Sequence, residues 1–227
     1  MGLQLQNVIP WGRRLEEYIR MFDLSSADRQ LSILDCAGGP ASFNCEMTRL
    51  GYKVISCDPI YQFSPAEINQ RIEETYTSVV EGVEANKENY VWGDVKSPAH
   101  LGEIRMMAMR QFLEDLAVGI EQGRYITAEL SVLPFNNQEF DLALCGHFLF
   151  SYSDFFSVEF HIASILELCR VAAEVRIFPL LKINNEPSPM VEPAMHELKA
   201  RGYQVEKRLV PYEFQKNGNQ MLVCRLA

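Results

Sequence analysis

The feature that most constrains this sequence is a strand, a glycine turn, a helix and a second strand between residues 31 and 58. The apolar run LSILDC precedes AGGP, and a helix is expected from Ala41 to Leu50, with Gly51 placed to end it. The segment YKVISCD is then typical of a second buried strand that ends in an acid. This order is a βαβ unit and predicts an α/β fold with a parallel sheet.

The second half of the chain continues the alternation. The segments RYITAEL, FDLALCG, EVRIFPLL, YQVEKRLV and MLVCRLA are typical of strands, and helices are expected at 155–172 and 193–201. The last two strands are joined by a segment too short for a helical crossover, so they should pair antiparallel, with Lys216, Asn217 and Gly218 in the turn. We therefore expect one domain over residues 1–227, with a seven-stranded, mostly parallel sheet and an antiparallel C-terminal strand.

Residues 61–123 interrupt this pattern and contain no convincing strand. Two amphipathic helices are expected there, with apolar or small side chains at helical spacing: Ile68, Ile72, Thr75, Val79 and Val83 in the first, and Leu101, Ile104, Ala108, Phe112 and Leu116 in the second. The segment is predicted to be a helical insertion. Its role is either extra core that covers the sheet or a lid or wall of a substrate pocket.

Charge and cysteine usage narrow the class of protein. The net charge of -9 disfavours a nucleic-acid partner and favours a small molecule. The six cysteines form no CxxC or histidine-flanked spacing, so we expect buried reduced thiols and no metal site. No leader opens the chain, and no apolar run approaches the roughly 20 residues of a membrane helix, so a cytoplasmic protein without membrane contact is expected. The sequence leaves the oligomeric state open.

The glycine loop is a candidate ligand site. Gly38 and Gly39 have no Cβ, so the backbone can approach a ligand closely, and the following helix directs its N-terminal N–H groups toward that ligand. Asp58 ends the second predicted strand, 19 residues after Gly39, where a carboxylate can accept both hydroxyls of a ribose. On these residues alone, the ligand is a dinucleotide or an adenosyl compound.

Two further motifs favour the adenosyl compound. The loop lacks the GxGxxG spacing that holds a pyrophosphate, and the third predicted strand leads into ELSVLPF, followed by FD at the next strand. With these motifs the chain resembles the class I S-adenosylmethionine-dependent methyltransferases, in a subgroup with a helical insertion between strands two and three. The resemblance covers residues 32–60 and 123–227. It implies a Rossmann-like fold with helices on both faces of the sheet, S-adenosylmethionine as cofactor and an acceptor that the motifs do not identify.

The resemblance also implies a set of cofactor-binding residues. The glycine loop would lie beside the methionyl part and the ribose, Asp58 would bind the ribose hydroxyls, and Glu129 would accept from the adenine amino group. One of Arg13, Arg14 and Tyr18, taken here as Arg14, would meet the cofactor carboxylate. The expected cofactor-binding residues are Asp35, Cys36, Ala37, Gly38, Gly39, Asp58, Pro59, Ile60, Glu129, Leu130, Cys145, Gly146 and Arg14.

His147 is the candidate catalytic residue. It follows the predicted fourth strand, at the edge where a parallel sheet places its ligands, and could act as general base on an acceptor O–H or N–H. A hydrogen-bonded structural histidine is the alternative. Ala37 and Ala41 stand where the family motif has glycines, which gives some support to a non-catalytic adenosyl-ligand sensor or scaffold. An NAD(P)-linked oxidoreductase is a further alternative, disfavoured by the missing GxGxxG.

Overall fold

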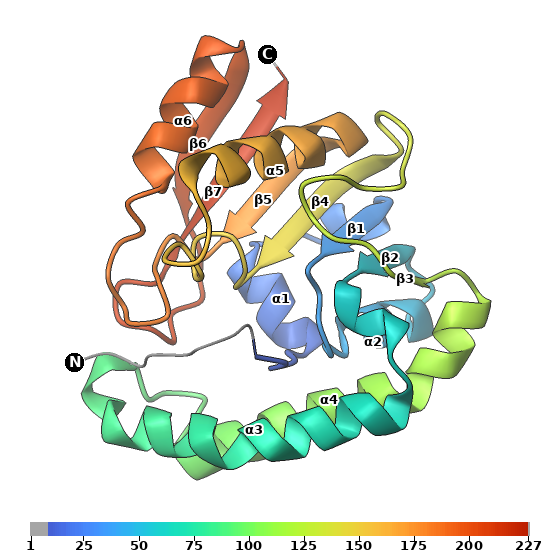
Figure 1. The fold of residues 1–227 in the computed structure, drawn as a ribbon, viewed down its shortest axis with the longest axis vertical. Helices are drawn as coiled ribbons and strands as arrows, with labels where there is room; N and C mark the ends of the chain where they lie inside the picture. The colour runs from blue at the N-terminus through green and yellow to red at the C-terminus, as the bar shows by residue number, and fades with distance from the viewer. Residues whose placement is uncertain (1–8, 227) are drawn as a thin grey trace.

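The computed structural model describes residues 9–226, and the two ends of the expected domain, residues 1–8 and 227, lie outside this range (Figure 1). Within it, a seven-stranded sheet has the order β3-β2-β1-β4-β5-β7-β6. The strands are β1 (Ile33–Cys36), β2 (Val54–Cys57), β3 (Tyr125–Ile126), β4 (Phe140–Gly146), β5 (Ala172–Phe178), β6 (Tyr203–Leu209) and β7 (Gln220–Leu226). The strand β7 lies between β5 and β6 and pairs antiparallel with both. The expected mostly parallel sheet with an antiparallel C-terminal strand is confirmed.

Helices cover both faces of the sheet, as expected. Helices α1 (Leu15–Met21) and α2 (Phe43–Arg49) lie on one face, and α5 (Val158–Val171) and α6 (Val191–Ala200) lie on the other (Figure 1). Alternate strand residues supply the two cores, because successive side chains of a strand point to opposite faces. On β1, Ile33 packs with α1 and α2, whereas Leu34 packs on the side of α5 and α6.

The three central strands end at the same level of the sheet. Cys36 of β1 is paired with Cys57 of β2 and Cys145 of β4, so the loops that follow these strands open at one edge. The third strand is much shorter than the expected RYITAEL. It has only two residues, because its single neighbour β2 ends at Cys57 and offers no partner beyond Ile126.

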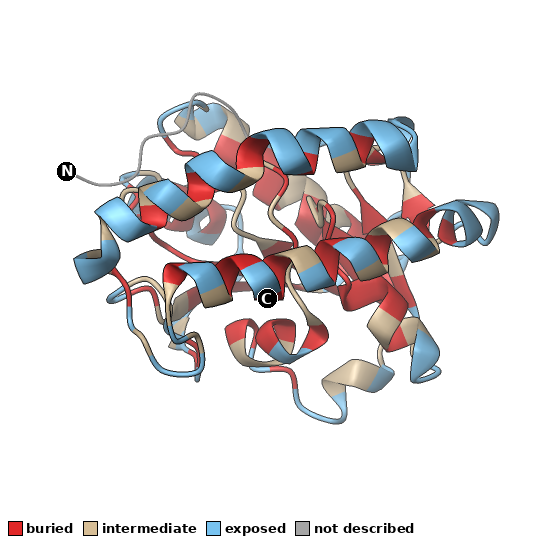
Figure 2. Ribbon diagram, turned by 90° about the horizontal axis from the view of Figure 1, so that it is seen from below, coloured by how far each residue is buried: buried red, intermediate tan, exposed pale blue. Residues whose placement is uncertain are grey.

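The expected helical insertion consists of α3 (Pro65–Ala85) and α4 (Pro98–Glu121). The two helices run side by side below the carboxyl ends of the strands (Figure 1), and α4 packs against α2 and β3. Both are amphipathic, with exposed positions between buried ones (Figure 2). The buried side of α3 is the predicted stripe of Ile68, Ile72, Thr75, Val79 and Val83. No helix within residues 9–226 combines the length and the apolar character needed to cross a bilayer.

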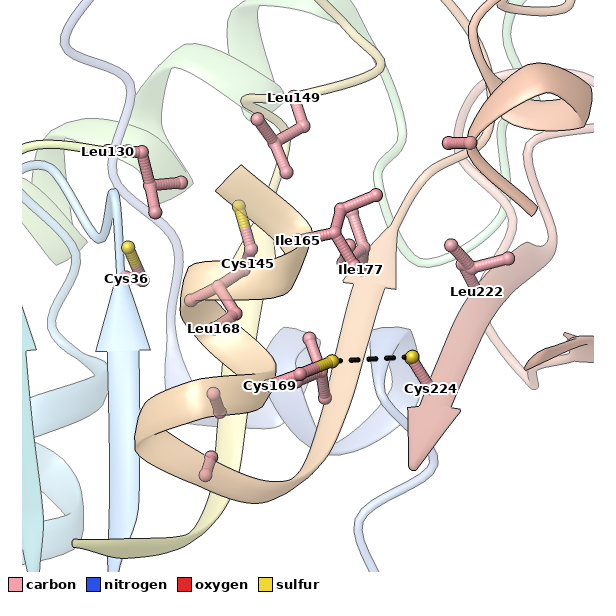
Figure 3. Packing of buried hydrophobic residues seen from close by; sticks show 14 of the residues in the cluster. Cys36, Leu130, Cys145, Leu149, Ile165, Leu168, Cys169, Ile177, Leu222 and Cys224 are labelled. Carbon is pink, nitrogen blue, oxygen red and sulfur yellow. Dashed lines mark hydrogen bonds between the residues drawn. The ribbon is translucent and has the colours of Figure 1, made fainter. Parts of the chain in front are cut away.

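All six cysteines are buried and free, as predicted. Five of them belong to the core between the sheet and the α5–α6 layer, shown in part in Figure 3. Cys169 of α5 faces Cys224 of β7 there, with their Sγ atoms 3.3 Å apart. The thiols therefore act as small apolar side chains that close the packing between helix and sheet.

Candidate functional site

A cavity of about 700 Å³ opens at the carboxyl edge of the sheet. The segments that follow β1, β2 and β4 line it, together with the N-terminal segment before α1 and both insertion helices. This is the edge at which open parallel sheets bind their ligands, because the loops after the strands converge there. The cavity thus coincides with the region that holds the glycine loop.

The glycine loop has a conformation that explains its composition. Gly38 lies so close to β1 that a Cβ on it would stand 2.3 Å from Oδ2 of Asp35, which excludes any side chain. Gly39 has φ 55°, in the left-handed region that glycine adopts readily. Ala37 has φ 56°, so the alanine in place of the first motif glycine is in the backbone conformation that glycine favours. The loop therefore keeps the glycine-type geometry at the cost of local strain.

Asp58 anchors this loop from the end of β2. Its Oδ2 accepts from the backbone N–H of Gly39 at 3.0 Å, and its Oδ1 accepts from the N–H of Ile60 at 2.8 Å. Burial raises the pKa of the carboxyl to about 6, although the two backbone hydrogen bonds act in the opposite direction. The carboxylate lines the cavity, and each oxygen has a further lone pair for a ligand hydroxyl.

Most of the predicted site residues surround the cavity together. Those that line it are Cys36, Ala37, Gly38, Gly39, Asp58, Pro59, Ile60, Glu129, Leu130, Gly146 and His147. Glu129 is exposed and follows the short β3. It lies far from the glycine loop in the sequence. The chain therefore brings its candidate ribose and adenine acids to one space.

Three predicted residues, Asp35, Cys145 and Arg14, do not line the cavity. Asp35 of β1 precedes the cavity-lining Cys36, and Cys145 of β4 precedes the cavity-lining Gly146. Both Asp35 and Cys145 are buried in the sheet. Cys145 and Gly146 belong to β4, as the strand pattern of FDLALCG predicts. Arg14 is the N-cap of α1 and forms an ion pair with Glu16 at 3.6 Å, and its Nε, like that of Arg13, is buried without a hydrogen-bond partner in the described part of the chain.

Asp35 instead supports the glycine loop from its buried position in β1. It is 1% exposed, and its two oxygens accept from the hydroxyls of Tyr18 at 3.1 Å and Ser56 at 3.0 Å. Burial raises its pKa to about 7, with these two hydrogen bonds acting against the shift. Since Gly38 rests on this carboxyl, Asp35 sets the height of the glycine loop above the sheet.

Arg13, not Arg14, is the arginine of the N-terminal segment that lines the cavity. Its Nη1 donates to the carbonyl of Trp11 at 3.2 Å, but its Nε has no hydrogen-bond partner and its guanidinium forms no ion pair within residues 9–226. Burial, and then the neighbouring Arg105, lower its pKa. A cation this confined without a counter-ion is costly unless a ligand neutralises it.

Arg105 of α4 is a second cavity-lining cation that the sequence analysis missed. It is 1% exposed and forms an ion pair with Glu17 of α1, whose other oxygen accepts from the Tyr212 hydroxyl at 3.0 Å. Burial alone would raise the pKa of Glu17, but the Arg105 partner outweighs it and lowers the pKa to about 2. The signal was present in the sequence, because Arg105 follows Leu101 and precedes Met109 at helical spacing on the apolar side of the helix.

His147 follows β4 directly and lines the cavity. Its φ is 54°, a strained value for a histidine, and its backbone N–H donates to the carbonyl of Phe178 at 2.6 Å. Within the described residues neither ring nitrogen has a hydrogen-bond partner, and Nδ1 is buried. Burial, and then Arg13 and Arg105, lower its pKa well below the usual value, so the imidazole is neutral.

Comparison with known proteins identifies a relative along almost the whole chain. The sequence is 34% identical over 224 residues to the uncharacterized protein MJ0045 of Methanocaldococcus jannaschii, which covers 98% of each chain. This chain belongs to the MJ0045 family. No protein-family model matches it.

Several solved structures are similar to this chain at low sequence identity. Magnesium protoporphyrin IX methyltransferase (ChlM) from Synechocystis PCC 6803 with bound SAM has 13% identity and a TM-score of 0.46, over 94% of this chain and 78% of that one. A SAM-dependent methyltransferase from Aquifex aeolicus has 13% identity and a TM-score of 0.46, over 94% and 89%. The PH0226 protein from Pyrococcus horikoshii OT3 has 11% identity and a TM-score of 0.48, over 93% and 91%. All three scores are below 0.5, so the fold of the MJ0045-family chain is assigned from its own strand order.

Proposed function

We propose that this protein binds S-adenosylmethionine in the cavity and transfers its methyl group to a small-molecule acceptor. The observation that carries the proposal is the convergence of the glycine loop, Asp58 and Glu129 on one cavity from three separate parts of the sequence. The motifs around these residues resemble the cofactor-binding motifs of the class I methyltransferases. The mostly parallel sheet with β7 inserted between β5 and β6 agrees with the fold that this resemblance implies.

The loop and the acids fit the adenosyl part of this cofactor. The backbone at Gly38 and Gly39 presents no side chain to the cavity, which leaves room for the ribose beside the loop. Asp58 would accept from the ribose hydroxyls, and it does so in the ionised form because the protonated carboxyl has fewer free lone pairs. Glu129, with Leu130 beside it, would accept from the adenine amino group.

Arg13 fits the other end of the cofactor. Within the described residues its charge is unpaired and its Nε has no partner, and it lines the cavity together with the glycine loop. The backbone of this segment also contacts the residues after the loop, since the carbonyl of Arg13 accepts from the N–H of Ser42 at 3.0 Å and Gly12 packs directly on Pro40. A carboxylate there would neutralise the guanidinium through a charge-assisted hydrogen bond. We therefore assign the cofactor carboxylate to Arg13 in place of Arg14.

The protein's own contribution to the reaction is mainly position and proton transfer. The bound cofactor supplies an activated methyl group on a sulfonium. The cavity walls would hold the acceptor in line with this group, which converts an encounter of two molecules into a unimolecular step. His147, neutral and without a partner, would take the proton if the nucleophile arrives protonated. The insertion of residues 61–123 would form the acceptor side of the cavity, to which it contributes Val79, Val83 and Leu101.

Calorimetric titration with S-adenosylmethionine, S-adenosylhomocysteine and NAD tests the proposal. We expect binding of both adenosyl ligands and none of NAD. Asp58→Asn should weaken that binding about tenfold to 100-fold, because a hydrogen bond to a charged group contributes about 1.5–3 kcal/mol. Asp23→Asn is the matched control, since Asp23 is exposed and lies outside the cavity.

A matched pair of variants tests the assignment of the cofactor carboxylate to Arg13. Arg13→Gln should weaken binding of the adenosyl ligands, and Arg14→Gln should leave it unchanged. Weakening by Arg14→Gln alone would reverse the assignment. If a folded protein binds neither adenosyl ligand, the proposed function is wrong.

A further inference from the structure

The cavity has walls beyond the residues that we assign to the cofactor, and these walls are mostly aromatic or aliphatic. Phe148, Phe156 and Phe160 come from the end of β4 and the start of α5. Val83 and Tyr90 come from the insertion, and Phe214 from the segment between β6 and β7. Three distant parts of the chain thus supply apolar side chains to the same space.

Several of these rings also pack on one another, so the walls are built from aromatic pairs. Phe156 is stacked on Phe160, with ring centroids 4.5 Å apart and 19° between the planes, and Phe148 meets Phe156 edge-on at 5.5 Å. On another wall, Tyr90 is stacked on Phe214, with centroids 4.8 Å apart and 26° between the planes. Planar aromatic walls favour a planar ligand, which gains stacking and edge-to-face contacts in addition to apolar burial.

The charges that face the cavity disfavour a cationic acceptor. Among the described lining residues, Asp58 and Glu129 are the only carboxylates, and the cofactor accounts for both. The cations are Arg13, Arg71 and Arg105. Arg105 and Arg71 have their own partners in Glu17 and Glu74, and the cofactor carboxylate would pair with Arg13. An ammonium group in the remaining space would therefore find no free carboxylate to pair with among the described lining residues.

His147 places one proton acceptor against this apolar space. It directly precedes Phe148, and its ring packs edge-on against Phe178, with centroids 5.3 Å apart. Its ring nitrogens have no hydrogen-bond partner within residues 9–226, so the imidazole is held by packing alone and can bind a ligand O–H. The strained backbone at φ 54° is retained although it is costly, which is common at functional positions.

We propose, on the basis of the proposed function, that the acceptor is a planar aromatic compound with a ring hydroxyl, and that His147 removes the proton of that hydroxyl. In this step the acceptor oxygen forms a bond to the methyl carbon of S-adenosylmethionine. The bond between that carbon and sulfur breaks, and its electron pair remains on sulfur, which leaves S-adenosylhomocysteine. The hydroxyl proton moves to the imidazole of His147 and then to solvent. The cofactor carboxylate on Arg13 would remove one of the two charges that lower the pKa of this imidazole, which makes the transient imidazolium less costly.

Three probes with related skeletons test the class of acceptor. The protein is saturated with S-adenosylhomocysteine and titrated with 2-naphthol, with decahydro-2-naphthol, which is not planar, and with 2-(aminomethyl)naphthalene, which is a cation. We expect 2-naphthol to bind at least about tenfold more tightly than either of the other two. With S-adenosylmethionine in its place, we expect methyl transfer to the naphthol oxygen, detected as 2-methoxynaphthalene.

Two matched pairs of variants test the residues. Phe156→Ser should weaken 2-naphthol binding about tenfold. Phe155→Ser should not, because the neighbouring Phe155 is 50% exposed and does not line the cavity. His147→Asn keeps a residue that tolerates the left-handed backbone and should lower transfer at least about 100-fold while both ligands still bind. His196→Asn, on the exposed side of α6, should leave transfer unchanged.

The outcomes separate this inference from the proposed function. If S-adenosylhomocysteine does not bind, the proposed function fails first. If it binds but 2-naphthol binds no better than the saturated or the cationic probe, the aromatic acceptor is wrong while the cofactor assignment stands. Binding of 2-naphthol without transfer overturns the hydroxyl as nucleophile. Full transfer by His147→Asn overturns the role of His147.

Discussion

Replacing Asp35 by Asn should change how the stability of this protein depends on pH. Asp35 lies in β1, 1% exposed, between the hydroxyls of Tyr18 and Ser56. Burial is the largest effect on its pKa, which is raised from 3.8 to about 7. An asparagine has nearly the same shape and keeps an acceptor for one hydroxyl, but it has no proton to lose.

The magnitude follows from the difference between the two states. Between the unfolded pKa of 3.8 and the folded pKa of about 7, the unfolded chain releases the Asp35 proton while the folded protein retains it. The stability that Asp35 contributes is therefore fully present below pH 3.8 and is lost as the pH rises through 7. The full loss corresponds to about 4 kcal/mol, of which about 2–3 kcal/mol falls between pH 5 and pH 8.

Urea denaturation of the parent protein and of Asp35→Asn at pH 5, 6, 7 and 8 measures this loss. The difference between their free energies of unfolding removes the contribution of other titrating groups, such as Asp58 and His147. We expect the free energy of unfolding of the variant to rise by about 2–3 kcal/mol relative to that of the parent protein between pH 5 and pH 8. A difference for Asp35→Asn that stays constant or moves the other way would refute the raised pKa.

Two further predictions concern the loop and its anchor. Ala37→Gly should raise the free energy of unfolding by about 0.5–1 kcal/mol, because it relieves the strain of φ 56°. Ala41→Gly should lower the free energy of unfolding by a similar amount, because Ala41 is buried and has no positive φ to relieve. Thermal denaturation of both variants measures these changes. Equal changes in the stability of the two variants would contradict strain at Ala37. Affinity for S-adenosylhomocysteine should be constant above pH 7 and fall up to about tenfold per pH unit below pH 6, as Asp58 takes up a proton. Calorimetry that gives one affinity down to pH 5 would exclude Asp58 as the ribose acceptor.

The predictions that the structure confirms depend on local pattern. The order of strand, glycine turn, helix and strand placed Gly39 and Asp58 at neighbouring strand ends, and they are hydrogen-bonded at 3.0 Å. The apolar spacing in residues 61–123 predicted two helices and the buried side of α3, because periodicity of 3.6 residues is a property of the chain itself. The short link between β6 and β7 predicted their antiparallel pairing for the same local reason.

The predictions that needed correction depend on what surrounds a residue. Arg13 and Arg14 are adjacent and chemically equal, and only the folded structure shows that Arg13 is the one that lines the cavity. The extent of β3 was set by where its neighbour β2 ends. The helical spacing places Arg105 on the apolar side of α4, but its partner Glu17 lies 88 residues away in the sequence and only the fold brings them together.

The sequence by itself determined the strand order along the chain, the glycine turn, the position of Asp58 at the end of β2 and the helical character of residues 61–123. Only the tertiary structure decided which side chains reach the cavity. On β1, Asp35 is sealed beneath the loop while the next residue, Cys36, lines the cavity. Composition cannot distinguish two such neighbours, because successive residues of a strand point to opposite faces and the identity of each face depends on helices and loops from elsewhere in the chain.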